Sequence, residues 1–165
     1  TERGSAKMGF ARMSDRIDDL DRKILAELQA DASQSLDEIA RKVGSSKTPV
    51  WNRIRRMREQ GVILRQTALL DAESLGIGLT VFLMVRTSDH RPEWLEQFAR
   101  ATRDMPEILG AYRMTGDLDY LIRARVSDVK AYDALYQQLT RRVDLADVSA
   151  SFVMEELKDT TALPV

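Results

Sequence analysis

Basic side chains gather between Arg41 and Arg65, and this stretch has the clearest chemistry in the chain. It holds eight lysines and arginines and one acid, Glu59, so its net charge is +7 in a chain whose formal net charge is −1. The basic residues are Arg41, Lys42, Lys47, Arg53, Arg55, Arg56, Arg58 and Arg65. Such a surface can neutralise phosphates and release the counterions condensed on DNA. The same charges also suit a solvated helix face, so charge alone leaves both interpretations open.

The elements that must position these charges begin with a short helix at Ser35. Ser35 and Glu38 have the spacing of a capping box, in which the hydroxyl and the acid satisfy amides at a helix start. Gly44 tolerates the left-handed backbone that ends a helix. Ser45 or Ser46 is then expected to cap a second helix. Two short helices joined by a tight turn are predicted.

The second helix is expected to run to Gly61. Pro49 falls in its first turn, where no amide hydrogen is needed. Its inward positions are the apolar residues at helical spacing, Val50, Ile54 and Met57. For Trp51, beside this face, partial burial is preferred over contact with a base. The pattern is that of a helix-turn-helix, and it favours DNA binding over a merely solvated face.

A third helix of the same domain is predicted before the turn. Asp18, Asp19 and Asp21 place negative charge at its positive end, and Leu20, Ile24 and Leu28 give it an apolar stripe. The sequence therefore predicts a helix-turn-helix (winged-helix-like) DNA-binding domain at residues 14–63, followed by a linking strand and turn at 64–78.

The second half of the chain alternates strand and helix signals. Strands are predicted at residues 79–86, 108–115, 120–126 and 148–157, with one helix starting at Pro92 and another capped by Ser127. The order β-α-β-β-α-β is that of a ferredoxin-like fold, predicted for residues 79–165. We expect an α+β chain whose helices cover one face of this sheet. A homodimer would cover the other face.

Composition excludes several kinds of site. The 165 residues contain no cysteine and a single histidine, His90, in a polar stretch expected to be an exposed loop. We therefore expect no metal, no cofactor and no catalytic residues. The longest apolar run, residues 76–85, is too short to cross a bilayer, and Thr1 to Met13 lacks the apolar core of a signal peptide. The natural start is expected at Met8 or Met13.

Together these residues resemble a known family. The chain is similar to the Lrp/AsnC (feast/famine) family of prokaryotic transcription regulators from Ile17 to about Val165. The matching pieces are Asp18-x-x-Asp21-x-x-Ile24-Leu25, Arg53-Ile54-x-x-Met57-x-x-x-Gly61-Val62-Ile63, Gly116-Asp117-x-Asp119-Tyr120 and Ser151-Phe152-Val153. Their order and spacing are specific as a set.

The resemblance implies partners and roles. The partner of the first domain is double-stranded DNA, and the residues expected to face it are Ser46, Lys47, Thr48, Asn52, Arg53 and Arg56. The effector is expected to be an amino acid, held where regulatory domains meet by Gly116, Asp117, Asp119, Tyr120, Ser149 and Ser151. Residues 64–70 would pair with another subunit, in a homodimer that assembles further to a tetramer or octamer. The resemblance also implies a cytoplasmic, nucleoid-associated protein with no membrane partner.

Two alternatives belong to other classes of protein. Asp117 and Asp119 could form an acid/base pair in a small-molecule-binding ferredoxin-like enzyme. Aspartates in tight turns are common for purely local hydrogen bonds, and no nucleophile, phosphate loop or metal set accompanies them. The other alternative is a mainly architectural DNA-compacting protein, which shares the DNA-facing features and differs in having no effector response and no discrete operators.

Overall fold

The computed structural model describes residues 17–165, which form two compact units. The first unit contains residues up to Ala68 together with Asp159–Val165, and the second is Leu69–Lys158. The last residues thus pack with the first unit, whereas the sequence analysis placed them in the second domain. The predicted start at Met8 or Met13 lies outside the described residues.

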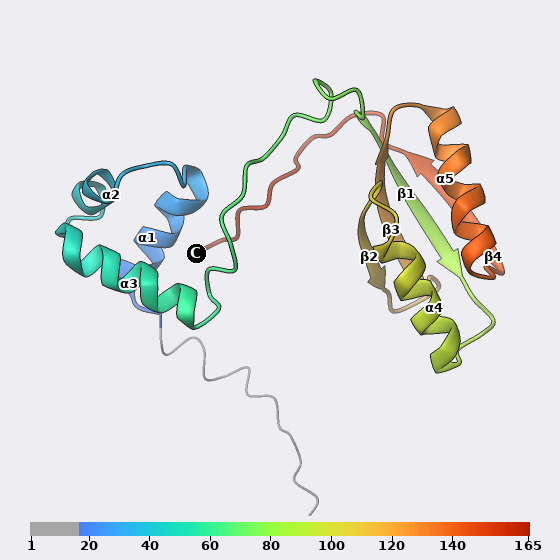
Figure 1. Cartoon of the computed structure of the whole chain (residues 1–165), viewed down its shortest axis with the longest axis horizontal. Coiled ribbons are helices and arrows are strands. Elements are labelled where there is room, and N and C mark those ends of the chain that lie inside the picture. Colours follow the sequence, from blue (N-terminus) through green and yellow to red (C-terminus); the bar gives the residue numbers. More distant parts are fainter. Residues whose placement is uncertain (1–16) are drawn as a thin grey trace, which may run out of the picture. The chain divides into compact units, whose positions relative to one another are not determined.

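The first unit is a bundle of three helices, as predicted (Figure 1). They are α1 (Asp19–Ala30), α2 (Leu36–Lys42) and α3 (Lys47–Glu59). The core is made by the apolar residues that the periodicity marked as inward, chiefly Ile24, Ile39, Val50, Ile54 and Met57. Each of these five is at most 5% exposed, so the helices are held mainly by this apolar seam.

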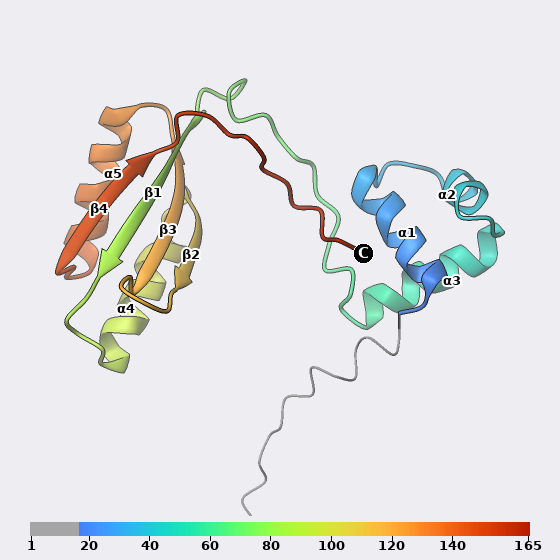
Figure 2. The ribbon, with the colours of Figure 1, turned by 180° about the vertical axis from the view of Figure 1, so that it is seen from behind.

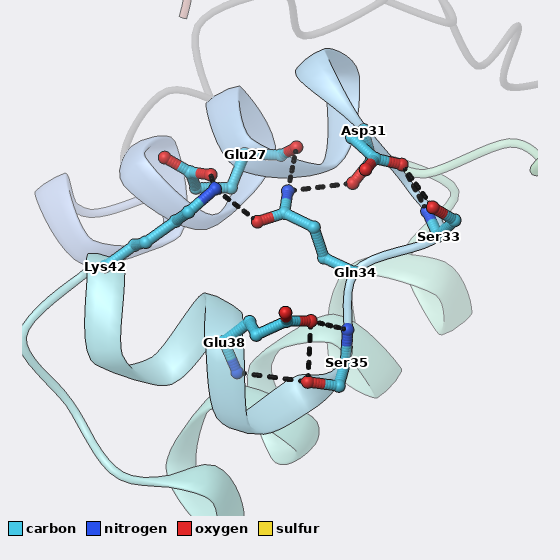
Figure 3. A network of polar contacts seen from close by, with 7 residues as sticks. All are labelled: Glu27, Asp31, Ser33, Gln34, Ser35, Glu38 and Lys42. Carbon is cyan, nitrogen blue, oxygen red and sulfur yellow. Dashed lines mark hydrogen bonds and ion pairs between the residues drawn. The ribbon is translucent and has the colours of Figure 1, made fainter.

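The start of α2 confirms the predicted capping box. The Ser35 hydroxyl accepts from the Glu38 amide at 3.2 Å, and the Glu38 carboxylate accepts from the Ser35 amide at 2.8 Å (Figure 3). In the same network Lys42 Nζ lies 3.0 Å from Glu27 Oε2 and ties the end of α2 to α1. The charge of Lys42 is therefore already matched inside the unit.

The turn between α2 and α3 depends on Gly44, whose φ of +69° is left-handed. Ser46 stands at the N-cap of α3 with extended backbone, but its side chain makes no capping hydrogen bond. The predicted side-chain cap is thus wrong, and the hydroxyl of Ser46 is left exposed beside the start of the helix. Gly61, at φ +72°, follows the end of α3 as expected.

The second unit is the predicted ferredoxin-like α+β domain. Its antiparallel sheet has the order β2-β3-β1-β4, and α4 and α5 cover one face (Figures 1 and 2). The elements are β1 (Leu79–Arg86), α4 (Pro92–Arg103), β2 (Ile108–Arg113), β3 (Tyr120–Val126), α5 (Val129–Arg142) and β4 (Asp147–Phe152). The core lies between the helices and the alternate residues of the strands that face them, for example Leu83, Ile122 and Leu139.

Some boundaries differ from the prediction. The strand β4 ends at Phe152 rather than at Leu157, and β2 ends at Arg113 rather than at Thr115. The cap of α5 is Asp128, whose carboxylate accepts from the Ala131 amide at 2.8 Å, and not Ser127. Residues 64–70 form no strand within this chain. Within residues 17–165, none of the helices has the length and apolar character needed to span a membrane.

Candidate DNA-binding and effector sites

The outer surface of α3 carries four of the six residues predicted to face DNA. Ser46, Lys47, Thr48 and Asn52 are exposed at the start of the helix, opposite the buried side formed by Val50, Ile54 and Met57. Hydroxyl, ammonium and amide groups are the side-chain types that reach phosphates and base edges. The helix therefore presents a polar face that suits a groove of DNA.

Arg53 and Arg56, the other two, are engaged within the unit. Arg53 Nη1 lies 2.6 Å from Asp18 Oδ2 and 2.9 Å from Asp21 Oδ1. Arg56 Nη2 lies 2.5 Å from Asp21 Oδ2. Asp21 is fully buried, so its carboxylate depends on these two guanidinium groups. The structure thus gives both arginines a partner from α1, which the sequence analysis did not foresee.

Asp18 and Asp21, the two acids that pair with these arginines, also form the cap of α1. The Asp18 carboxylate accepts from the Asp21 amide at 2.9 Å, and the Asp21 carboxylate accepts from the Asp18 amide at 3.2 Å. The hydrogen bond from Arg53, with that from the Asp21 amide, lowers the pKa of Asp18 to about 2. The hydrogen bonds from Arg53 to the carboxylates of Asp18 and Asp21 raise the pKa of Arg53. The spacing Asp18-x-x-Asp21 is the sequence signal for this cap, because an acid at the third helical position completes a capping box.

Two further side chains on α3 were not among the predicted contacts. Trp51 is 45% exposed, more than the preferred partial burial, and the Arg55 guanidinium lies 4.7 Å from its ring centroid. Arg55 also pairs with Glu59 at 3.7 Å, and Lys47 pairs with Asp37 at 2.9 Å. Such exposed pairs are weak and open readily, so these two cations remain available to phosphate.

In the second unit, the hairpin turn between β2 and β3 is built around Asp119. Its amide donates to the Val85 carbonyl at 3.1 Å, its carbonyl accepts from the Met114 amide at 2.8 Å, and its carboxylate accepts from the Thr87 amide at 2.8 Å. Gly116, at φ +93°, supplies the left-handed residue of the turn. The hairpin is thereby tied to the end of β1.

The strand register separates the remaining predicted effector residues. Ser149 and Ser151 pair with Met84 and Phe82, so both serines lie on the sheet face that the helices leave open. Tyr120 lies on the opposite face, is 7% exposed, and has its ring centroid 4.6 Å from that of Phe98. Tyr120 and the two serines therefore do not line one pocket within a subunit.

Arg86 is the residue near this turn that the sequence analysis missed. Its Nε donates to the Asp117 carbonyl at 3.0 Å, and its Nη1 lies 3.1 Å from Asp147 Oδ2. Arg86 therefore joins the hairpin turn to the start of β4. Tyr120 instead contributes to a groove of about 450 Å³ between α4 and β2, beside Leu95, Phe98 and Arg103.

Comparison with known families covers nearly all of the described chain. Residues 17–58 match the AsnC-type helix-turn-helix domain, and residues 80–163 match the Lrp/AsnC ligand binding domain. The DNA-binding transcriptional activator DecR of Escherichia coli K12 is 44% identical over 150 residues, which are 90% of this chain and 99% of the relative.

Solved structures show the same two-part fold. The structure of an AsnC family transcriptional regulator from Agrobacterium tumefaciens is similar with a TM-score of 0.87 and 47% identity, over 89% of this chain and 96% of that one. A transcriptional regulator from Neisseria meningitidis in complex with L-methionine is similar with a TM-score of 0.85 and 32% identity, over the same shares of the two chains. Both halves of the chain are therefore matched together and in the same order.

Proposed function

The chain belongs to the Lrp/AsnC family of DNA-binding transcriptional regulators, and we propose that it binds double-stranded DNA through α3 and responds to an amino-acid effector. The observation that carries the DNA-binding part is the exposed polar face of α3 in a helix-turn-helix. Ser46, Lys47, Thr48 and Asn52 are assigned to the groove and its flanking phosphates. Arg55, on the same outer surface, adds a cation that the sequence analysis did not assign.

Salt dependence of DNA affinity tests this assignment. Each phosphate that the protein neutralises contributes about −0.9 to the slope of log affinity against log salt. We expect Lys47→Gln to weaken binding and flatten this slope, because it removes an exposed cation at the start of α3. Lys130→Gln removes an exposed cation from α5 and should change neither the DNA affinity nor its salt slope. An affinity that does not depend on salt in the wild type would contradict DNA binding by this surface.

The effector is proposed to be an amino acid bound near the hairpin turn, where regulatory domains of two subunits meet. The L-methionine complex of the Neisseria relative supports this class of ligand. Gly116, Asp117 and Asp119 of the turn, with Ser149 and Ser151 on the open face of the sheet, are the proposed contacts. Asp119 already bonds the Thr87 amide, so an ammonium group would share its carboxylate with that amide. Tyr120 is left out because it faces the helices.

A thermal-shift screen of the twenty amino acids tests the effector class. A ligand present at 100 times its dissociation constant stabilises the folded protein by about 2.7 kcal/mol. We expect one or a few amino acids to raise the melting temperature and to change DNA affinity. If the protein compacts DNA of any sequence and no amino acid changes its melting temperature or its DNA affinity, its role would instead be architectural.

Assembly is proposed to run from a homodimer to a tetramer or octamer. The open face of the sheet carries the half-buried apolar residues Phe82, Met84 and Leu121. Residues 64–70, which have no strand partner in one chain, are proposed to pair with their copy in a second subunit. Two helix-turn-helix units would then read two half-sites at a fixed spacing. A cytoplasmic, nucleoid-associated location follows as part of this proposal.

A further inference from the structure

The ion cluster at the start of α1, made by Asp18, Asp21, Arg53 and Arg56, surrounds one buried carboxylate. Asp21 is fully buried, and the Arg53 side chain is 25% exposed. Asp18 and Asp21 supply two negative charges and Arg53 and Arg56 two positive ones, so the cluster as a whole is neutral. A phosphate could recruit Arg53 only by leaving a buried carboxylate with one partner fewer, which is costly.

The geometry of the cluster fixes one helix against another. Arg53 and Arg56 are three residues apart on α3 and therefore lie on one side of it, in successive positions along its axis. Both reach the same carboxylate, and Arg53 also reaches the Asp18 carboxylate. The Nε of Arg56 is buried and has no hydrogen-bond partner among the described residues, which shows that this guanidinium group is packed inward on that edge.

We propose that Asp21 is a positioning residue for DNA recognition: with Asp18 it holds Arg53 and Arg56, so that these arginines orient α3 and do not neutralise phosphates. The inference rests on the proposed DNA binding, and it specifies which basic residues of α3 contact phosphates and which ones orient the helix. The Asp18–Asp21 capping box then has two tasks, since it closes the start of α1 and receives the arginines of α3. The positive charge that meets DNA comes from the exposed cations, among them Lys47 and Arg55.

A matched pair of substitutions separates orientation from charge. Arg53→Gln and Arg55→Gln each remove one positive charge from α3, two residues apart. Binding is measured on a duplex selected by the wild-type protein from a random-sequence library, over a range of salt and below the melting temperature of each variant. We expect Arg53→Gln to weaken binding by a constant factor at every salt concentration, with the slope of the wild type retained. Arg55→Gln is expected to reduce the slope by about 0.9 for each bound subunit.

Asp21→Asn is a third variant, for which the two explanations predict opposite changes in DNA affinity. If Asp21 orients α3, the folded variant binds the selected duplex less tightly and discriminates less against a random duplex. If the carboxylate were only a competitor for arginines that contact phosphate, its removal would tighten binding and steepen the slope. Tighter binding by Asp21→Asn, or a flattened slope for Arg53→Gln, overturns the proposal. A salt-independent wild type would instead overturn DNA binding itself.

If the variants do not fold, a measurement on the wild-type protein tests the same proposal. In protein labelled with ¹⁵N in the arginine side chains, the guanidinium resonances of Arg53 are expected to keep their positions when duplex DNA is added, while those of Arg55 move. Guanidinium resonances of Arg53 that shift as far as those of Arg55 would show that DNA displaces Asp18 and Asp21, and would refute the assignment.

Discussion

The Asp119 carboxylate accepts a 2.8 Å hydrogen bond from the backbone amide of Thr87, the first residue after β1. Because Asp119 also bonds Val85 and Met114 through its own backbone, it fixes the hairpin against the end of a central strand. This contact gives Asp119 a structural task that is present without any ligand. An effector site at this turn would therefore use a carboxylate that is already oriented.

Asp119→Ala should lower the stability of the second unit by about 1–2 kcal/mol, because it leaves the Thr87 amide without its charged acceptor. Asp117→Ala is the matched control, since its carboxylate makes no hydrogen bond within the described residues while its backbone carbonyl still accepts from Arg86. Urea unfolding followed by circular dichroism measures the difference. Equal stabilities for the two variants would contradict the structural task of Asp119.

The Asp119→Ala variant also tests where the effector binds. If the hairpin holds it, Asp119→Ala binds the amino acid found by the thermal-shift screen more weakly, as measured by calorimetry below the melting range. A destabilised Asp119→Ala protein with the effector affinity of the wild type would move the effector site away from this turn.

Acid should loosen the first unit through Asp18. Its pKa is about 2 in the folded protein, below the ordinary value of 3.8, because Arg53 and the Asp21 amide donate to its carboxylate. A carboxyl group whose pKa is lowered by folding stabilises the protein above its unfolded pKa, and this contribution is lost as the pH falls from about 3.8 through about 2.

Asp18→Asn is expected to remove that part of the acid sensitivity, since asparagine caps a helix as well as aspartate but does not titrate. Asp19→Asn makes the same change of charge at an exposed neighbour and is the control for the change of charge alone. Thermal unfolding between pH 5 and pH 2 gives the comparison. Coincident acid transitions for Asp18→Asn and the wild type would show that Asp18 is not a titrating contact.

Gly44 offers a purely conformational test of the turn between α2 and α3. Its φ is +69°, and an added Cβ would meet no atom within 4 Å. Gly44→Ala should therefore cost about 1–2 kcal/mol through the left-handed backbone alone, without a steric clash. Gly44→Asn should cost less, because asparagine visits this conformation more readily. Equal stabilities of the two variants in chemical denaturation would argue that the turn changes its backbone conformation.

Local patterns in the sequence predicted the local parts of the structure. The Ser35–Glu38 capping box, the glycine after α2 and the inward residues of α3 depend on residues within one or two turns, so spacing is enough to identify them. The cluster at Asp21 could not be found in this way. Arg53 and Arg56 lie 32 and 35 residues from Asp21 in sequence, and a cation that will be paired at such a distance has the same local pattern as a free one.

The strand errors have a similar cause. The apolar residues Val153 and Met154 prolong the strand signal beyond Phe152. In the structure the pairing of β4 with β1 ends at Phe152, opposite Val81, and the Val153 amide donates the last hydrogen bond, to the Thr80 carbonyl. The family resemblance implied that Tyr120 lines an effector pocket together with the turn residues that it follows in sequence. The two-residue period of β3 instead places it on the face covered by the helices, whereas Leu121 lies on the open face.

The open face of the sheet provides the last prediction. Leu121 pairs with Met84 on one side and Tyr112 on the other, so it lies among apolar neighbours on the face opposite α4 and α5. If two subunits join through this face, Leu121→Glu buries an unpaired carboxylate at the interface and should dissociate the dimer at micromolar concentration. Val129→Glu is the control, because Val129 is 61% exposed in the first turn of α5, where an acid favours the helix. Light scattering of the full chain is expected to give a smaller mass for Leu121→Glu than for Val129→Glu and the wild type. A Leu121→Glu protein with the wild-type mass, at the same concentration, would place the contact between subunits on another surface.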